Sequence, residues 1–355
     1  MSPSDTPPER SRGERVARAL GRPIVRNILS RFSAWRGVLV LNYHRIGDHA
    51  DPWDRSLWSA SAEELDAQLA MLADQAEVIG PDEIETARRE RRRGRRVLLT
   101  FDDGYRDNYE IAYPLLRRHG LRATFFLTTG FVDSPQIAWW DELAWMVCRA
   151  KTSTLPAGDW LGGPVALEAS GSETAITTLV ARYKTLPSEH AQAFLDYVAS
   201  ATGSGRPGAQ EAEELWMTWE MARELRDGGM AIGGHTVTHP VFARISIERT
   251  EEEVAHCAER LQAELGEPMR WFAYPVGARD TFTPETQRIL REHGVQLAFS
   301  FYGGYAGFSG WDPLDVPRVH IGSGYGPELL RATVWIPQLF ARERPSSQPP
   351  YTEAG

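Results

Sequence analysis

Six short apolar runs recur along the chain, and each is followed by a stretch with helical character. Runs of this length, bounded by polar segments, predict buried strands. Strands that alternate with helices favour a parallel sheet or an α/β barrel. The six predicted strands are GVLVLNYH (37–44), RVLLTFDD (96–103), ATFFLTT (123–129), MAIGGH (230–235), RWFAYP (270–275) and VQLAFSF (295–301).

Two of the intervening stretches have the periodicity of helices and end at a glycine. These are DNYEIAYPLLRRHG (107–120) and SIERTEEEVAHCAERLQAELG (246–266). We expect Gly120 and Gly266 to form left-handed C-caps, because glycine enters that conformation without a steric penalty.

Residues 138–216 break the alternation of strands and helices. The stretch begins with the aromatic segment AWWDELAWMV, passes through Gly- and Ser-rich segments, and contains two predicted helices near 173–185 and 188–201. We interpret it as a helical insertion into the barrel that shapes one wall of the cleft. No internal repeat is visible, so neither a solenoid nor a propeller is supported.

The two ends of the chain differ from this central part. Residues 1–13 are rich in Pro, Ser and charge and are predicted to be unstructured. Within 14–36, apolar residues recur every four positions between arginines, which predicts a basic amphipathic helix. Such a helix either lies on an anionic membrane surface or packs its apolar stripe on the barrel. The expected organisation is an N-terminal tail and helix (1–36), a barrel (37–335) and a flexible C-terminal tail (336–355).

The composition is that of a soluble globular protein, with 42% hydrophobic and 25% charged residues among 355. A net charge of −9 gives no general attraction for nucleic acid. The two cysteines lack CxxC spacing, so neither a disulfide framework nor a cysteine-based zinc site is indicated. Since neither a secretory signal pattern nor a run of about 18 apolar residues is visible, we expect a cytoplasmic location, with peripheral contact to the inner membrane face through residues 14–36.

Two adjacent carboxylates, Asp102 and Asp103, directly follow one predicted strand in LTFDDGY (99–105). Neighbouring carboxylates repel each other, so the pair is costly unless a cation or a proton resolves it. With a divalent metal on Asp103, Asp102 can stay ionised and accept a proton from a water. The alternative interpretation is a helix N-cap, a position that Asp favours.

Two histidines, His235 and His239, follow another predicted strand in IGGHTVTHP (232–240). The spacing of four predicts both imidazoles on one face of a helix or helical turn, within reach of a single ion. Together with Asp103 they leave positions open for water and substrate, as a catalytic site requires. Zinc is the preferred metal for such ligands, although cobalt, nickel and iron also suit them.

A third strand ends in WFAYPVGA (271–278). The backbone N–H of Val276 could point toward a developing oxyanion. A plain strand-ending turn explains the same residues, because Pro and Gly favour turns without any function.

These three segments, in this order, resemble the polysaccharide deacetylase, or NodB homology, family of carbohydrate esterases. The resemblance covers about residues 37–330 and is nearest to the exopolysaccharide-associated subgroup. It implies a deformed (β/α) barrel with a helical insertion, and hydrolysis of an N-acetyl or, less often, an O-acetyl group on a sugar. Carried over by position, Asp102 is similar to the family's general base, and Asp103, His235 and His239 to its metal ligands.

The sequence departs from the family pattern at two places. Members commonly carry an arginine before the third turn that orients the base, but Ala273 stands there, and Arg106 or Arg279 is a candidate substitute. The usual late histidine segment that supplies the general acid is also not clear. His44, in LNYHRI, resembles the acid of the exopolysaccharide subgroup, whereas His320, in VPRVH, lies where the common late motif falls. We favour His44, because it directly ends a buried strand.

Aromatic residues near the three segments are candidates for contact with the substrate, since flat rings stack on sugars. We predict this role for Tyr105, Trp140 and Tyr274. The cluster of Trp139, Trp140, Asp141 and Trp145 is equally compatible with the hydrophobic core, because aromatic residues at helical spacing are common there.

The sequence therefore predicts a metal-dependent hydrolase that removes N-acetyl groups from an amino sugar in a polysaccharide or glycolipid, in exopolysaccharide biosynthesis. The alternatives are a hydrolase of another acyl amide, a catalytically silent carbohydrate-binding barrel, and a membrane-associated scaffold that relies on the N-terminal helix. The presence of Asp102 speaks for an enzyme, because turnover needs this residue and metal binding does not.

Overall fold

The computed structural model describes residues 34–48, 57–90, 93–167, 172–322 and 324–343. The helix predicted within 14–36 therefore lies outside the described residues, apart from its last three positions. No helix in the described part is long and apolar enough to cross a membrane.

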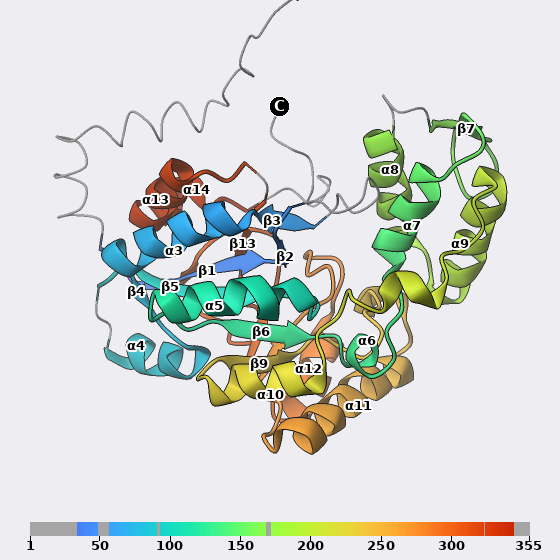
Figure 1. The fold of residues 1–355 in the computed structure, drawn as a ribbon. Helices are drawn as coiled ribbons and strands as arrows, with labels where there is room; N and C mark the ends of the chain where they lie inside the picture. The colour runs from blue at the N-terminus through green and yellow to red at the C-terminus, as the bar shows by residue number, and fades with distance from the viewer. Residues whose placement is uncertain (1–33, 49–56, 91–92, 168–171, 323, 344–355) are drawn as a thin grey trace, which may run out of the picture.

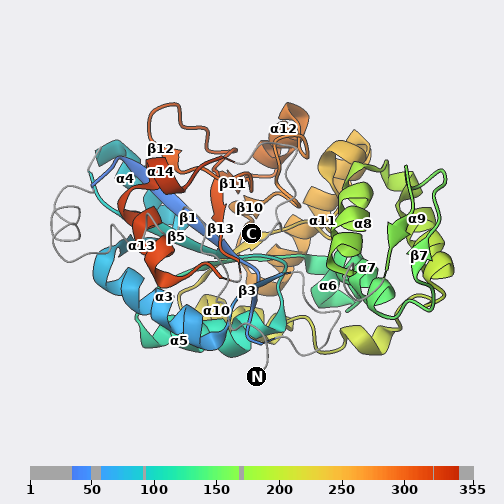
Figure 2. The ribbon, with the colours of Figure 1, turned by 90° about the horizontal axis from the view of Figure 1, so that it is seen from above.

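A curled sheet of parallel strands lies at the centre of the molecule (Figures 1 and 2). Its strands are β1 (Gly37–Tyr43), β5 (Arg96–Phe101), β6 (Thr124–Leu127), β9 (Ala231–Gly234), β10 (Trp271–Ala273), β11 (Leu297–Phe299) and β13 (Arg318–His320). They run in the order β11-β10-β9-β6-β5-β1, and β13 pairs with the free side of β1. Val316, just before β13, bridges to Phe299 of β11. The sheet therefore curls into a deformed barrel, as predicted.

Short strands extend this sheet or pair away from it. β4 (Glu77–Val78) lies parallel to β5, and β12 (Ala306–Gly307) lies antiparallel to β1. The two-residue strand β2 (Arg45–Ile46) pairs with β3 (Trp58–Ala60) beside the end of β1. A further antiparallel pair, β7 (Thr154–Leu155) and β8 (Val165–Ala166), belongs to the insertion.

Helices cover the outside of the barrel and bury their apolar faces against it (Figures 1 and 2). Several begin or end at residues that cap them: Ser61 and Glu64 form a capping box at α3, and Gly266 ends α11 in the left-handed conformation expected for it. The outer helices are α3 (Ala62–Gln75), α4 (Ile84–Glu90), α5 (Tyr113–Arg118), α6 (Thr129–Asp133), α10 (Trp219–Asp227), α11 (Ile247–Leu265), α12 (Pro284–Glu292), α13 (Pro327–Trp335) and α14 (Pro337–Phe340), with short 3₁₀ turns η1 (Pro81–Glu83) and η4 (Phe242–Arg244).

The helix predicted over 107–120 is divided in two. Its first part is a π-helical turn, η2 (Asn108–Ala112), in which the N–H of Tyr113 bonds to the carbonyl of Asn108. Pro114 follows, and it has no N–H to continue the ordinary helical pattern. The regular helix α5 then runs to Arg118, and Gly120 takes the positive φ expected of it, 65°.

The insertion forms a helical lobe beside the barrel (Figure 1). It contains α7 (Trp139–Cys148), α8 (Ser172–Thr185), α9 (Ser188–Thr202) and the 3₁₀ turn η3 (Ala209–Ala212). The two helices predicted near 173–185 and 188–201 thus agree with α8 and α9 to within one residue. The lobe has its own hydrophobic cluster, which reaches the barrel through Tyr105, Phe131 and Val276.

Both expected boundaries of the barrel shift once the chain is folded. Trp35, assigned to the N-terminal segment, is only 5% exposed and donates its indole N–H to the carbonyl of Val334 at 3.0 Å. At the other end, α14 lies within the stretch expected to be tail, and Ala341 beyond it is buried. The folded unit therefore includes residues on both sides of the predicted limits.

Candidate active site

The carboxyl ends of the parallel strands carry the polar residues singled out in the sequence. Asp102 and Asp103 follow β5, His235 follows β9, and the turn with Val276 follows β10. His44 follows β1, and β13 ends in His320. Because parallel strands end on the same side of a barrel, these side chains gather at one end of the molecule.

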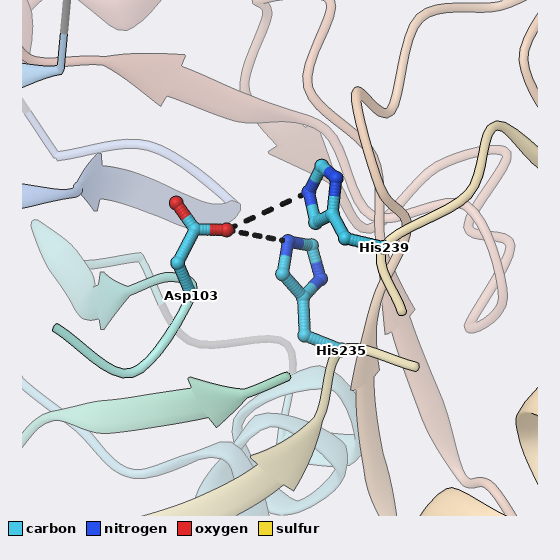
Figure 3. A group of neighbouring side chains, drawn as sticks. All are labelled: Asp103, His235 and His239. Atoms are coloured by element: carbon cyan, nitrogen blue, oxygen red, sulfur yellow. Dashed lines mark ion pairs between the residues drawn. The ribbon is translucent and has the colours of Figure 1, made fainter. Parts of the chain in front are cut away.

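Asp103, His235 and His239 converge so that one atom of each lies within 4.8 Å of the others. Figure 3 shows the carboxylate facing both rings, with Oδ1 of Asp103 at 3.4 Å from Nε2 of His235 and 3.5 Å from Nε2 of His239. All three side chains are buried. Two atoms that each lie about 2.1 Å from one ion in tetrahedral geometry are about 3.4 Å apart. The spacing and the donor set therefore fit a divalent metal.

The turn after β5 presents Asp103 through an unusual backbone conformation. Asp103 has a φ of 73° and Gly104 a φ of 89°. Aspartate tolerates the left-handed region better than most residues, which explains its presence here. The helical residues that follow begin at Arg106, so neither Asp102 nor Asp103 lies at the N-cap position and the N-cap interpretation is wrong.

The segment from His235 to His239 is not the helical turn that the spacing predicted. It is a bent loop in which Thr236 has a φ of 68° and His239 a φ of 56°. The Thr236 hydroxyl accepts a hydrogen bond from the His239 N–H at 2.9 Å and stabilises the bend. The two imidazoles therefore converge because the loop reverses, not because they share a helix face.

Glu253 of α11 stabilises this loop, a role that the sequence did not predict. Its carboxylate, 1% exposed, accepts hydrogen bonds from the backbone N–H groups of Val237 at 2.8 Å and Thr238 at 2.9 Å. Arg249 provides the counter-charge at 2.7 Å. Nothing in the sequence separates Glu253 from the adjacent acidic residues of the same helix, so its role becomes visible only in the fold.

The two imidazoles are oriented by different means. Nδ1 of His235 lies 2.7 Å from the carbonyl of Ala273, which fixes Nε2 as the atom that faces Asp103. Nδ1 of His239 is buried and has no hydrogen-bond partner among the described residues. No hydrogen bond at Nδ1 within this part of the chain therefore orients the ring of His239.

The charges of the site suit ligands for a cation. Burial, together with the adjacent His235, lowers the pKa of His239 to about 3, so its ring is neutral. Burial raises the pKa of Asp103, but its close contact with Nε2 of His235 and the charges of nearby imidazoles outweigh this and leave the pKa below the usual range. A carboxylate and a neutral imidazole are the forms that bind a metal. Burial lowers the pKa of His235, but the carboxylates of Asp103 and Asp102 outweigh burial and raise it above its ordinary value, so a metal that binds there displaces a proton from this ring.

Asp102 forms a buried ion pair with Arg318 of β13. Nη1 of Arg318 lies 2.7 Å from Oδ1 of Asp102, and the two side chains are 1% and 3% exposed. Arg318 also donates from Nε to the carbonyl of Ser300 at 3.0 Å. Burial raises the pKa of Asp102, but the charge and hydrogen bond of Arg318, together with the charges of His235 and His44, outweigh burial and hold the pKa well below its ordinary value. Asp102 is therefore ionised.

Neither arginine proposed from the sequence as the partner of this carboxylate reaches it. Arg106 pairs with Glu110, and Arg279 pairs with Glu343, both at 2.7 Å near the surface. The residue that contacts Asp102 is Arg318, two positions before His320 on the same strand. A signal for it was present, because residues two apart on a strand face the same side.

His44 and His320 lie next to each other at the barrel end, with ring centroids 6.2 Å apart. The backbone of His44 is held on both sides, by Ser59 at 2.9 Å and by Asn108 at 2.6 Å. Burial lowers the pKa of His44, although the carboxylates of Asp103 and Asp102 oppose the shift. His44 is the more buried of the two rings and lies within the electrostatic reach of both carboxylates.

Val276 has a φ of 62°, a strained conformation for a β-branched residue. Its backbone N–H bonds to no acceptor in the described parts of the chain. Gly277 follows with the same φ, and its carbonyl accepts from the N–H of Phe301 at 2.7 Å. The segment after β11 therefore fixes the turn through Gly277, and the N–H of Val276 remains free to donate.

All three residues predicted to contact substrate, Tyr105, Trp140 and Tyr274, are buried. Tyr274 is 1% exposed, stacks on Phe282 at 4.0 Å and donates to the carbonyl of Leu314, so it is a core residue. Tyr105 is fully buried and stacks on Trp216 at 4.5 Å. Each side chain lies in a hydrophobic cluster, and contact with substrate stays a prediction for both.

Most of the aromatic residues of α7 lie in the hydrophobic core, as one of the two interpretations predicted. Trp139 and Trp145 are each 7% exposed, and Trp139 stacks on Tyr183 at 4.1 Å. Asp141 is buried among them because the hydroxyl of Tyr105 donates to its carboxylate at 2.8 Å. Trp140 differs from its neighbours, since its ring lies against His239 with centroids 4.5 Å apart.

Comparison with known proteins identifies the family. A family model described as polysaccharide deacetylase matches residues 89–151 and 181–298, about half of the chain. The chain belongs to the polysaccharide deacetylase family. The family predicted from the sequence is thus confirmed, and with it the expected class of enzyme at the level of the family.

Individual relatives of this family member are distant or matched over a short stretch. YxkH of Bacillus subtilis, whose name describes it as a polysaccharide deacetylase, is 61% identical over 31 residues, which are 9% of this chain and 11% of the length of YxkH. Among solved structures, the deacetylase PplD of Streptococcus pyogenes has a TM-score of 0.56 at 19% identity, covering 84% of this chain and 98% of PplD. IcaB of Ammonifex degensii has a TM-score of 0.53 at 23% identity, covering 83% and 96%. These two structures share the fold of the family member described above.

Proposed function

We propose that this protein is a metal-dependent hydrolase that removes N-acetyl groups from an amino sugar in a polysaccharide or a glycolipid. The observation that carries the proposal is the convergence of Asp103, His235 and His239 beside a second, ionised carboxylate that Arg318 holds. Membership in the polysaccharide deacetylase family supports the acetylated sugar as substrate class. The resemblance of the LNYHRI segment to exopolysaccharide deacetylases supports an exopolysaccharide as its setting.

The chain offers a residue for each step of amide hydrolysis. A divalent ion held by Asp103, His235 and His239 supplies Lewis acidity toward the acetyl carbonyl, and this ligand set favours zinc. Asp102 accepts the proton of the attacking water, because it is ionised and directly precedes the ligand Asp103 in the chain. The free N–H of Val276 donates to the oxyanion that develops on the acetyl oxygen.

The general acid that protonates the leaving amine is His44 in this proposal. Its low pKa makes the protonated ring a stronger donor, and its fixed backbone aims it at the end of the barrel. His320, on the neighbouring strand, is the competing candidate.

Acetate release provides the direct test of the function. We expect the purified full chain, loaded with zinc, to release acetate from chitin oligomers or from a glycolipid that carries N-acetylglucosamine. Removal of the metal with a chelator should reduce the release to background, and added zinc should restore it. Magnesium is the matched control and should not restore activity, because it prefers oxygen ligands. Activity that survives complete metal removal would contradict the proposal.

Replacing each histidine in turn separates the two candidate acids. We expect His44→Gln to lower kcat about 10²-fold, near the lower end of the effect of a general acid, because the ring of His320 is close enough to substitute in part. His320→Gln should lower kcat less than about tenfold. Both variants should bind zinc as the wild type does. A larger loss in His320→Gln than in His44→Gln would assign the role to His320.

A further inference from the structure

The helical insertion contacts one candidate metal ligand, His239, and its neighbouring chain pairs with the turn that carries another, Asp103. The C-terminal end of the insertion and the residue after it pair with the turn that carries Asp103. The N–H of Met217 donates to the carbonyl of Gly104 at 3.0 Å, and the N–H of Arg106 donates to the carbonyl of Leu215 at 2.8 Å. The first helix of the insertion, α7, places Trp140 against the ring of His239 at 4.5 Å and an angle of 63°. The lobe is therefore docked directly on the site.

The contact with Trp140 restrains the ring of His239, which has no hydrogen bond at Nδ1 among the described residues. The ring of His235 is fixed by its hydrogen bond to Ala273, whereas Nδ1 of His239 has no hydrogen-bond partner among the described residues. An imidazole without such a bond can rotate about its side-chain torsions unless packing prevents it. The indole of Trp140 lies edge to face with this ring, a favourable aromatic arrangement.

Trp140 is itself locked in place by buried hydrogen bonds. Its indole N–H donates to the hydroxyl of Tyr105 at 2.9 Å, and that hydroxyl donates to Asp141 at 2.8 Å. All three side chains are nearly inaccessible to solvent, at 6%, 0% and 1% exposure. Tyr105 lies two residues after Asp103. Through Tyr105 and Trp140, the turn that carries Asp103 is therefore connected to the ring of His239.

From this arrangement we infer that Trp140, held by Tyr105 and Asp141, is a positioning residue that fixes the ring of His239, so that the insertion forms part of the metal centre. The inference rests on the proposed function, because it requires the three ligands to bind a metal. It also explains why the charged side chain of Asp141 is buried beside the tryptophans of this helix. Partners beyond the immediate ligands typically change metal affinity by a factor of about 10 to 100.

Cobalt(II) titration of the metal-free full chain tests the inference independently of catalysis. The visible absorption of bound cobalt reports the ligand geometry, and the same titration gives the dissociation constant. We expect Trp140→Ala to weaken cobalt binding about 10- to 100-fold and to change the absorption spectrum. Trp140→Phe and Tyr105→Phe should shift affinity in the same direction by smaller factors, because each removes the hydrogen bond but keeps a ring.

Trp145→Phe is the matched control, since Trp145 lies on the same helix with nearly the same exposure, and its ring lies under the guanidinium of Arg149 at 4.6 Å. It should bind cobalt as the wild type does. If the wild type binds no cobalt, the proposed function fails and the inference fails with it. If the wild type binds cobalt and Trp140→Ala matches it in affinity and spectrum, the inference alone is overturned. Should Trp140→Ala not fold, unchanged affinity in both Trp140→Phe and Tyr105→Phe overturns it.

Discussion

Replacing Asp102 with Asn is expected to lower kcat for acetate release by about 10³- to 10⁴-fold, in the upper part of the range for a lost general base. Asparagine has nearly the same shape and keeps an oxygen that can accept from Arg318, but it cannot take a proton from water. Asp102 is ionised in the folded protein because Arg318, with His235 and His44, outweighs the effect of burial, so the variant removes a charge that is present in the wild type. Initial rates on the acetylated sugar measure the effect.

Zinc affinity is the control for this substitution. The predicted ligands are Asp103, His235 and His239, so Asp102→Asn should bind zinc within a few-fold of the wild type, whereas Asp103→Asn should lose most of its affinity. If Asp102→Asn keeps more than about one tenth of the wild-type rate, the base lies elsewhere. If the wild type also releases no acetate but binds sugar, the silent carbohydrate-binding barrel becomes the better description.

The strands, most helices and the family could be predicted from the sequence because their signals are local. Each buried strand is a continuous apolar run, and the helices of the insertion have a clear 3.6-residue period. The three ligands could be predicted as well, since Asp103 and the two histidines follow such runs directly. A residue at the end of a parallel strand reaches the same end of the barrel wherever it lies in the chain.

Loop conformation could not be predicted from spacing alone. Two histidines four apart fit a helix, but Thr236 and His239 adopt positive φ values and Glu253 stabilises the resulting bend from another helix. The direction of Tyr274 was hidden for a similar reason. Whether a residue that ends a strand faces the cleft or the core depends on the register and on neighbours such as Phe282, which lie elsewhere in the chain.

The partner of Asp102 was hidden by distance along the chain. Arg318 lies 216 residues away and reaches Asp102 because β13 and β5 both pair with β1. Arg106 and Arg279 were closer to the motifs in sequence, but both lie near the surface with carboxylate partners of their own. Proximity along the chain was therefore a poor guide to which charge is buried with Asp102.

Replacing Arg318 with Met is expected to reduce the free energy of unfolding by about 3 to 5 kcal/mol, because it leaves the Asp102 carboxylate buried without a counter-charge. Methionine fills most of the volume between Phe126 and Phe301, so lost packing contributes less. Urea denaturation of the metal-free protein measures the change. Arg279→Met is the matched control and should shift stability by no more than about 0.5 kcal/mol, since its ion pair with Glu343 is exposed.

The double variant Arg318→Met with Asp102→Asn separates the charge from other effects of the substitution. Each single change leaves one buried charge without its partner, whereas the double change leaves none. The double variant should therefore be more stable than the sum of the two single losses predicts, by about 1 to 3 kcal/mol. Its acetate release should stay as low as that of Asp102→Asn, because the double variant still lacks the carboxylate that accepts the proton. Strictly additive losses would show that Arg318 stabilises the barrel through packing and not by pairing with Asp102.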